Sequence, residues 1–181
     1  MDLPLMKKDF TDNHQTKNRN MDSKKMTKEQ KYELLVAQVS SLLEGETNWT
    51  ARLAETCAAI HDAMGFFWVG FYLVEDEQLV IGPFQGSVAC LRIPKGKGVC
   101  GAAWEQRKTL IVRDVEKFPG HIACSSLSKS EIVVPLFNAE NEVVGVLDID
   151  SDELFTFDET DAKYLEEIVK ILNNSIGFST K

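Results

Sequence analysis

Three cysteines lie within one stretch that is rich in glycine and proline, and they are the residues of this sequence best suited to chemistry. Cys90, Cys100 and Cys124 each neighbour turn-forming or polar residues, and Cys124 ends the run 118–124 (FPGHIAC). A thiolate reacts where it is accessible and its surroundings are polar, and loops provide both conditions. The fourth cysteine, Cys57, has helical spacing among apolar residues, so we predict that it is a small buried core residue. The sequence indicates a thiol enzyme or a redox sensor.

Two acids end a predicted strand and form a second candidate group. Asp148 and Asp150 are two residues apart, so they point to one face of the strand while Leu147 and Ile149 point to the other. Solvated acids are common at strand ends, but valines on the same face suggest partial enclosure here. Glu131 begins the neighbouring predicted strand and can join them. Close carboxylates raise one another's pKa, which lets one stay protonated and donate a proton while another binds a cation.

A zinc site is the main alternative for the same region. His121 and Cys124 are three residues apart, and two further cysteines could complete four ligands. Structural zinc sites usually present close cysteine pairs, whereas none of these three cysteines has another within four residues. We therefore predict no metal, and we interpret His121 as a turn residue that hydrogen-bonds to the backbone.

The run 96–101 (GKGVCG) matches the dinucleotide pattern G-x-G-x-x-G. The elements around it do not form a βαβ unit, so we interpret the match as coincidental. Its glycines are better explained by close approach of the backbone to a ligand. Amides at the start of the helical turn predicted for 102–106 could hold a carboxylate.

The elements that position these residues predict an α+β fold rather than alternating strands and helices. Apolar residues recur at helical spacing after Lys28 and after Gly45, and a last helix begins with Asp158 as its N-cap. The expected strands are 66–74, 78–81, 88–93, 109–112, 131–137 and 142–150. The last two form a hairpin around 138–141. We predict a mainly antiparallel central sheet with the N- and C-terminal helices packed on one face.

Composition limits the organisation and the partners. The chain has 181 residues, of which 44% are hydrophobic and 27% charged, as expected for one globular domain. Lys+Arg number 20 against 28 Asp+Glu, and the net charge of −8 argues against binding to nucleic acid. No apolar run has the length of a signal peptide or a membrane span, so we expect a cytoplasmic protein. Residues 1–25 are polar and predicted to be a disordered extension to a domain at 26–178.

The motifs together resemble the free methionine-(R)-sulfoxide reductases, single-domain members of the GAF superfamily. The resemblance extends from Trp49 to about Ile171. Its motifs, in order, are WVGFY at 68–72, GPFQG at 82–86, KGKGVCG at 95–101, FPGHIAC at 118–124, SEIVVP at 130–135 and GVLDID at 145–150. The resemblance implies that 26–178 is one GAF-like catalytic domain.

Roles for the cysteines follow from this resemblance. It implies that Cys124 is the nucleophile that attacks the sulfoxide sulfur and that Cys90 forms a disulfide with it. Cys100 is implied to be an auxiliary or alternative resolving thiol. The division of the resolving role between Cys90 and Cys100 stays open.

The resemblance also implies the substrate-binding residues. Glu131, Asp148 and Asp150 correspond to acids that bind the substrate, and Trp68 and Tyr72 to aromatic residues that line the pocket. Which acid is protonated stays open, with Asp150 and Glu131 as the candidates. The preference for the R over the S sulfoxide comes from the resemblance alone.

The implied reaction requires no bound cofactor. Free methionine sulfoxide is reduced through a cysteine sulfenic acid and a disulfide, and thioredoxin, supplied by NADPH and thioredoxin reductase, resets the enzyme. Such an enzyme repairs oxidised free methionine under oxidative stress. We also expect a homodimer through the helical layer, because the first helix has apolar positions beyond its core face. The alternative function is a GAF-type module that binds a small molecule or senses oxidation without turnover.

Overall fold

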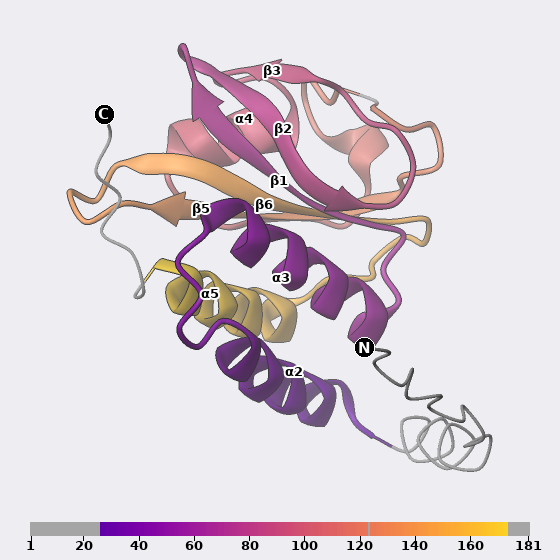
Figure 1. The fold of residues 1–181 in the computed structure, drawn as a ribbon. Helices are drawn as coiled ribbons and strands as arrows, with labels where there is room; N and C mark the ends of the chain where they lie inside the picture. The colour runs from indigo at the N-terminus through magenta and orange to yellow at the C-terminus, as the bar shows by residue number, and fades with distance from the viewer. Residues whose placement is uncertain (1–25, 123, 174–181) are drawn as a thin grey trace, which may run out of the picture.

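A six-stranded antiparallel sheet lies at the centre of the domain, as Figure 1 shows. The computed structural model describes residues 26–122 and 124–173. The predicted extension 1–25 and the end of the predicted domain, 174–178, lie outside the described residues. The strand order is β3-β2-β1-β6-β5-β4. The elements are α2 (Lys28–Leu42), α3 (Trp49–Met64), β1 (Trp68–Glu75), β2 (Gln78–Gln85), β3 (Arg92–Pro94), α4 (Gly98–Gln106), β4 (Leu110–Val112), the 3-10 helix η1 (Val115–Lys117), β5 (Ser130–Phe137), β6 (Val143–Ser151) and α5 (Glu159–Asn173).

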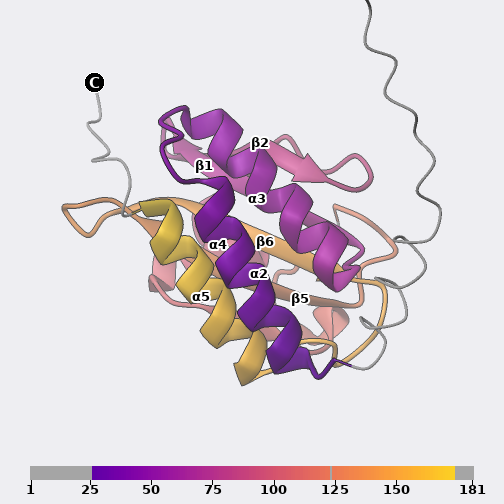
Figure 2. The ribbon, with the colours of Figure 1, turned by 60° about the horizontal axis from the view of Figure 1, so that its bottom comes forward.

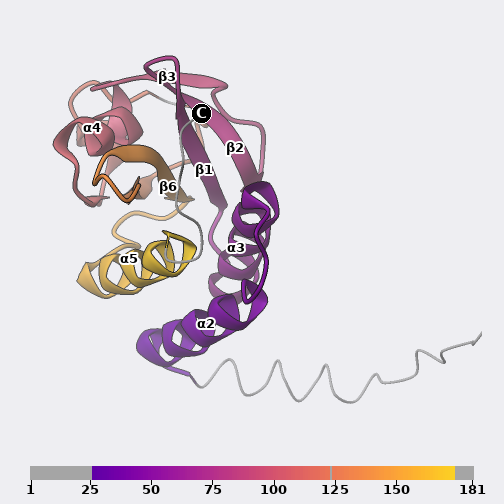
Figure 3. The same cartoon turned by 60° about the vertical axis from the view of Figure 1, so that its left-hand side comes forward.

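Helices cover both faces of the sheet. Figures 2 and 3 show α2, α3 and α5 together on one face, and Figure 3 shows α4 on the other. The alternation along β6 matches this division, because Leu147 and Ile149 pack in the core with α2, α3 and α5 while Val146 packs in the core beside α4. The α+β fold, the antiparallel sheet and the grouping of the N- and C-terminal helices are confirmed.

One predicted strand was wrong. The structure continues β2 through Pro83 to Gln85, and 86–91 form a loop that leads into the short strand β3. Pro83 is tolerated because β3 pairs only with Gln78–Val80, so this part of β2 has one hydrogen-bonded neighbour instead of two. As a consequence Cys90 lies on a loop, not on a strand.

The other expected elements are confirmed to within a few residues. The β5–β6 hairpin closes with a hydrogen bond of 2.9 Å from the Asn138 amide to the Glu142 carbonyl oxygen. Asp158 precedes α5, and its Oδ1 atom accepts a hydrogen bond of 2.7 Å from the Thr160 amide, as an N-cap does. Cys57 is fully buried, as predicted. Within the described ranges, no helix combines the length and the apolar character needed to cross a membrane.

Arg52 joins the helical layer, and the sequence pattern did not indicate this role. Its side chain is fully buried in α3. The guanidinium donates hydrogen bonds of 2.9 Å to the carbonyl oxygen of Leu43, 2.8 Å to that of Glu46 and 3.2 Å to that of Ile171. It therefore ties the start of α3 to the end of α2 and to the end of α5.

We predict that Arg52→Met lowers the free energy of unfolding by about 3 kcal/mol, because it leaves buried carbonyl oxygens without a charged donor. Chemical denaturation measures the change. Arg113→Met is the control, since the Arg113 side chain is 57% exposed and its loss should change stability by less than about 0.5 kcal/mol. Equal stability of the two variants would contradict the role assigned to Arg52.

Candidate active site

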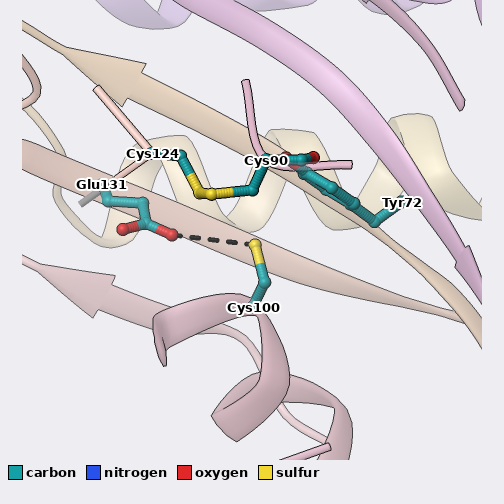
Figure 4. The surroundings of a disulfide bond; sticks show 5 residues. All are labelled: Tyr72, Cys90, Cys100, Cys124 and Glu131. Atoms are coloured by element: carbon teal, nitrogen blue, oxygen red, sulfur yellow. Dashed lines mark hydrogen bonds between the residues drawn. A yellow bond between two sulfur atoms is a disulfide. The ribbon is translucent and has the colours of Figure 1, made fainter. Parts of the chain in front are cut away.

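Cys90 and Cys124 form a disulfide between the β2–β3 loop and the segment before β5, as Figure 4 shows. Their Cα atoms are 5.2 Å apart, although the two residues are separated by 34 positions in sequence. Both side chains are only partly buried. The pairing that the family resemblance implied is therefore confirmed, and the disulfide is only partly enclosed.

Cys100 lies in a different environment from the other two cysteines. The sequence placed it before a helical turn, but α4 begins at Gly98, so Cys100 lies in the first turn of a helix and is 3% exposed. Figure 4 shows it pointing from α4 toward the disulfide, and its Sγ atom is 3.8 Å from Glu131 Oε1. Burial raises the pKa of the Cys100 thiol, and the nearby carboxylates of Asp148 and Glu131 raise it further. Cys100 is therefore a protonated thiol at neutral pH.

The three predicted acids gather on the same face of the sheet as α4. Glu131 on β5 is paired with Asp150 on β6, and Asp148 lies two residues earlier on β6. Glu131 and Asp148 are each 6% exposed. Burial raises the pKa of both carboxyls well above the usual range, and the charge of Asp150 adds to the effect. Burial also raises the pKa of Asp150, to about 6, despite a hydrogen bond from Ser128 that lowers it.

Trp68 and Tyr72 stand side by side on β1, and they also hold the loop that carries Cys90. Their ring centroids are 6.1 Å apart. The Tyr72 hydroxyl donates a hydrogen bond of 2.9 Å to the Cys90 carbonyl oxygen, and Trp68 Nε1 donates one of 2.9 Å to that of Ser87. Gly86 allows this approach, since a Cβ atom there would lie 2.5 Å from Trp68 Cδ1. Sequence reasoning found the two rings but missed these hydrogen bonds.

One cavity brings most of these residues together. The space between its lining side chains is about 500 Å³ when the open mouth is included. Of the eight predicted site residues, seven line it, and the eighth, Cys90, is joined by the disulfide to Cys124, which lines it. Ser125, Ser128 and His121 also line the cavity. The sequence analysis did not predict the two serines as site residues and gave His121 only a role in a turn. Their closeness to Cys124 in sequence was the signal that could have identified them.

The N-terminus of α4 also faces the cavity, which Gly98 and Val99 line. No side-chain hydrogen bond caps this helix within the described part of the chain. The first amides of a helix have no partner inside it and attract negative charge. The Gly98 amide already donates a hydrogen bond of 3.2 Å to the Gly120 carbonyl oxygen, so the predicted role in holding a carboxylate falls to the next amides of the helix. No nucleotide-binding βαβ unit surrounds this segment in the described ranges.

Comparisons with known proteins agree with this arrangement. The family model of the GAF domain matches residues 46–176. GAF domain-containing protein A of Dictyostelium discoideum is 60% identical over 85% of this chain and 98% of its own. Free methionine-R-sulfoxide reductase of Escherichia coli (strain K12) is 45% identical over 84% of this chain and 92% of its own. The X-ray structure of free methionine-R-sulfoxide reductase from Neisseria meningitidis, in complex with its substrate, aligns with a TM-score of 0.81 and 53% identity over 82% of this chain and 90% of that chain.

Proposed function

Because the chain belongs to the GAF domain family and its relatives include free methionine-R-sulfoxide reductases, we propose that it reduces free methionine-(R)-sulfoxide to methionine as a thiol-dependent oxidoreductase. The observation that carries this proposal is that a disulfide-bonded pair, Cys90 and Cys124, meets three acids at one cavity, which Cys124 lines. A thiol pair supplies the two electrons that reduction of a sulfoxide needs.

Each part of the substrate has a suitable partner in the cavity. The buried carboxylate of Asp148 suits the ammonium group, whose charge favours the ionised form of this acid, and the N-terminus of α4 suits the carboxylate. The rings of Trp68 and Tyr72 suit the S-methyl group. A methionine within a peptide lacks both free ends and would leave these buried groups unpaired, which explains selectivity for the free amino acid.

The proposed reaction begins with attack of the Cys124 thiolate on the sulfoxide sulfur. A protonated acid donates a hydrogen bond to the sulfoxide oxygen and gives up its proton as the S–O bond breaks; Asp150 and Glu131 are the candidates, and burial raises the pKa of both. The oxygen passes to Cys124 as a sulfenic acid and methionine is released. The Cys90 thiol then condenses with the sulfenic acid, which forms the disulfide and releases one water molecule.

The burial of the cysteines supports Cys90 as the resolving partner. Cys90 already lies at bonding distance from Cys124, whereas Cys100 is enclosed beneath them in α4. Thioredoxin, kept reduced by NADPH and thioredoxin reductase, is the proposed reductant of the disulfide. Val88 and Leu91, which flank Cys90, are 87% and 73% exposed, so a protein reductant can approach from this side.

We predict that Tyr72→Phe slows formation of the disulfide about fivefold while the first release of methionine changes little. The ring remains in the pocket, but the hydrogen bond that positions the Cys90 carbonyl is lost, and such a bond contributes about 1 kcal/mol. Trapping of the Cys124 sulfenic acid with dimedone during a single turnover measures the delay. Tyr164→Phe, which removes a hydroxyl from the helical layer, is the control. Disulfide formation at the wild-type rate in Tyr72→Phe would refute the positioning role.

The proposed function is tested by NADPH consumption with thioredoxin and thioredoxin reductase. Free methionine-(R)-sulfoxide, the free S form and N-acetylmethionine-(R)-sulfoxide are offered separately. We expect turnover of the free R form alone. Absence of turnover with any of the three from reduced protein would favour the alternative, a GAF-type module that binds a small molecule or senses oxidation.

A further inference from the structure

Cys100, Glu131 and Asp148 bring together one sulfur and two oxygen ligands at the inner end of the cavity. The Cys100 sulfur and one oxygen of each carboxylate lie within 4.8 Å of one another. The three residues come from α4, β5 and β6, so the fold fixes their arrangement from three directions. All three are buried, in contrast to the clusters of exposed acids that are common on protein surfaces.

The Asp148 side chain, which belongs to this group, has an oxygen without a hydrogen-bond partner among the described residues. Its Oδ1 atom is buried and has no hydrogen-bond partner within residues 26–122 and 124–173, and the residue is 6% exposed. A buried acceptor without a partner is unfavourable. In the proposed reaction the substrate ammonium would satisfy it, whereas between turnovers another cation can do so.

The mixture of ligands selects the kind of cation. Ca²⁺ and Mg²⁺ prefer oxygen ligands only, whereas Zn²⁺ binds thiolate and carboxylate together in sites with four ligands. The distance of 3.8 Å between Cys100 Sγ and Glu131 Oε1 suits two ligands of one tetrahedral ion. Asp150, on the same face of β6 as Asp148, or a water molecule can supply the fourth position.

We propose that Cys100, Glu131 and Asp148 bind Zn²⁺ in the substrate-free protein and that the bound ion excludes methionine sulfoxide. Zinc displaces the proton of the Cys100 thiol and those held by the carboxyls, and the resulting thiolate and two carboxylates leave the site with one net negative charge. This site differs from the zinc site that the sequence spacing argued against, because it uses neither His121 nor Cys124. It serves inhibition rather than the reaction, and its metal-binding test does not depend on the proposed function.

The oxidised protein gives a direct test, because the disulfide leaves Cys57 and Cys100 as the two free cysteines. Titration with Co²⁺, as a spectroscopic substitute for Zn²⁺, reports a thiolate ligand through its sulfur-to-metal charge-transfer band. We expect one equivalent to bind, with the band retained in Cys57→Ser and lost in Cys100→Ser. Cys57 is the matched control because its sulfur faces the Pro83 carbonyl oxygen at 3.3 Å and lies outside the cavity.

Calorimetry with Zn²⁺ completes the test. We expect Asp148→Asn to weaken binding at least about tenfold, and circular dichroism checks that each variant is folded. Free methionine sulfoxide should compete with Zn²⁺, and in the reduced enzyme Zn²⁺ should inhibit turnover until a chelator is added. Three results would each overturn the proposal: the wild type shows no charge-transfer band, Cys57→Ser removes the band, or Cys100→Ser binds Zn²⁺ with unchanged affinity. If the protein has no reductase activity, the spectroscopic and calorimetric results still decide it.

Discussion

Cys124→Ser is expected to lower kcat/KM for free methionine-(R)-sulfoxide by at least about 1000-fold. A serine hydroxyl is not ionised at neutral pH, and its oxygen cannot take up the sulfoxide oxygen as a sulfenic acid. The coupled NADPH assay measures the loss. Circular dichroism and thermal unfolding establish that the variant is folded, since it also lacks the disulfide.

Cys90→Ser is the matched control for this variant because it removes the same disulfide but keeps the proposed nucleophile. We expect it to release one equivalent of methionine and then stop with a sulfenic acid on Cys124. Cys57→Ser should retain full activity, since Cys57 is buried in the helical layer. A Cys124→Ser protein with near-normal turnover would disprove the assignment of the nucleophile.

The second large effect is expected from Asp148→Asn, which should lower kcat/KM about 100-fold. Its carboxylate is the proposed partner of the substrate ammonium, and a buried hydrogen bond between two charged groups contributes about 2 to 3 kcal/mol. Kinetics over a range of substrate concentrations separate the effect on KM from that on kcat. Asp152→Asn is the control, because Asp152 is exposed just beyond β6. Equal losses in the two variants would indicate a general effect of charge.

Asp148→Asn should also make the free energy of unfolding depend less on pH. Burial raises the pKa of Glu131, Asp148 and Asp150, so the folded protein holds protons that the unfolded chain releases at lower pH. The free energy of unfolding therefore falls as pH rises above about 4, the usual carboxyl pKa. For Asp150 this decrease ends near its folded pKa of about 6. The asparagine cannot ionise, so the variant should lose less stability than the wild type between pH 4 and neutral pH. Chemical denaturation at several pH values measures this loss. A steeper decrease in the variant than in the wild type would contradict the raised pKa of Asp148.

The period of two along β6 was sufficient to predict much of the site. It placed Asp148 and Asp150 on one face, and the structure puts that face beside α4 and the cavity. Helical spacing was likewise sufficient to predict burial of Cys57. Such periodic patterns are local, so they can be read without knowledge of tertiary contacts.

Contacts between distant segments could not be predicted in this way. The prediction of a strand at 88–93 was wrong. Residues that favour strands occur there, but the pairing of β1 with β2 extends β2 to Gln85 and leaves 86–91 as a loop. The surroundings of Cys100 depend on how α4 packs against β5 and β6. The hydrogen bond from Tyr72 to Cys90 and those of Arg52 link residues that no local pattern connects. The homodimer stays a prediction.

The central claim is that Cys124 and Cys90 reduce free methionine-(R)-sulfoxide by forming one disulfide. A single turnover tests it most directly: fully reduced protein is mixed with excess substrate and no reductant, and methionine and disulfides are quantified by mass spectrometry. We predict one methionine per protein and an equal amount of the Cys90–Cys124 disulfide, with Cys57 and Cys100 still reduced. Release of no methionine, or release of methionine with Cys90 and Cys124 both left as thiols, would contradict the account.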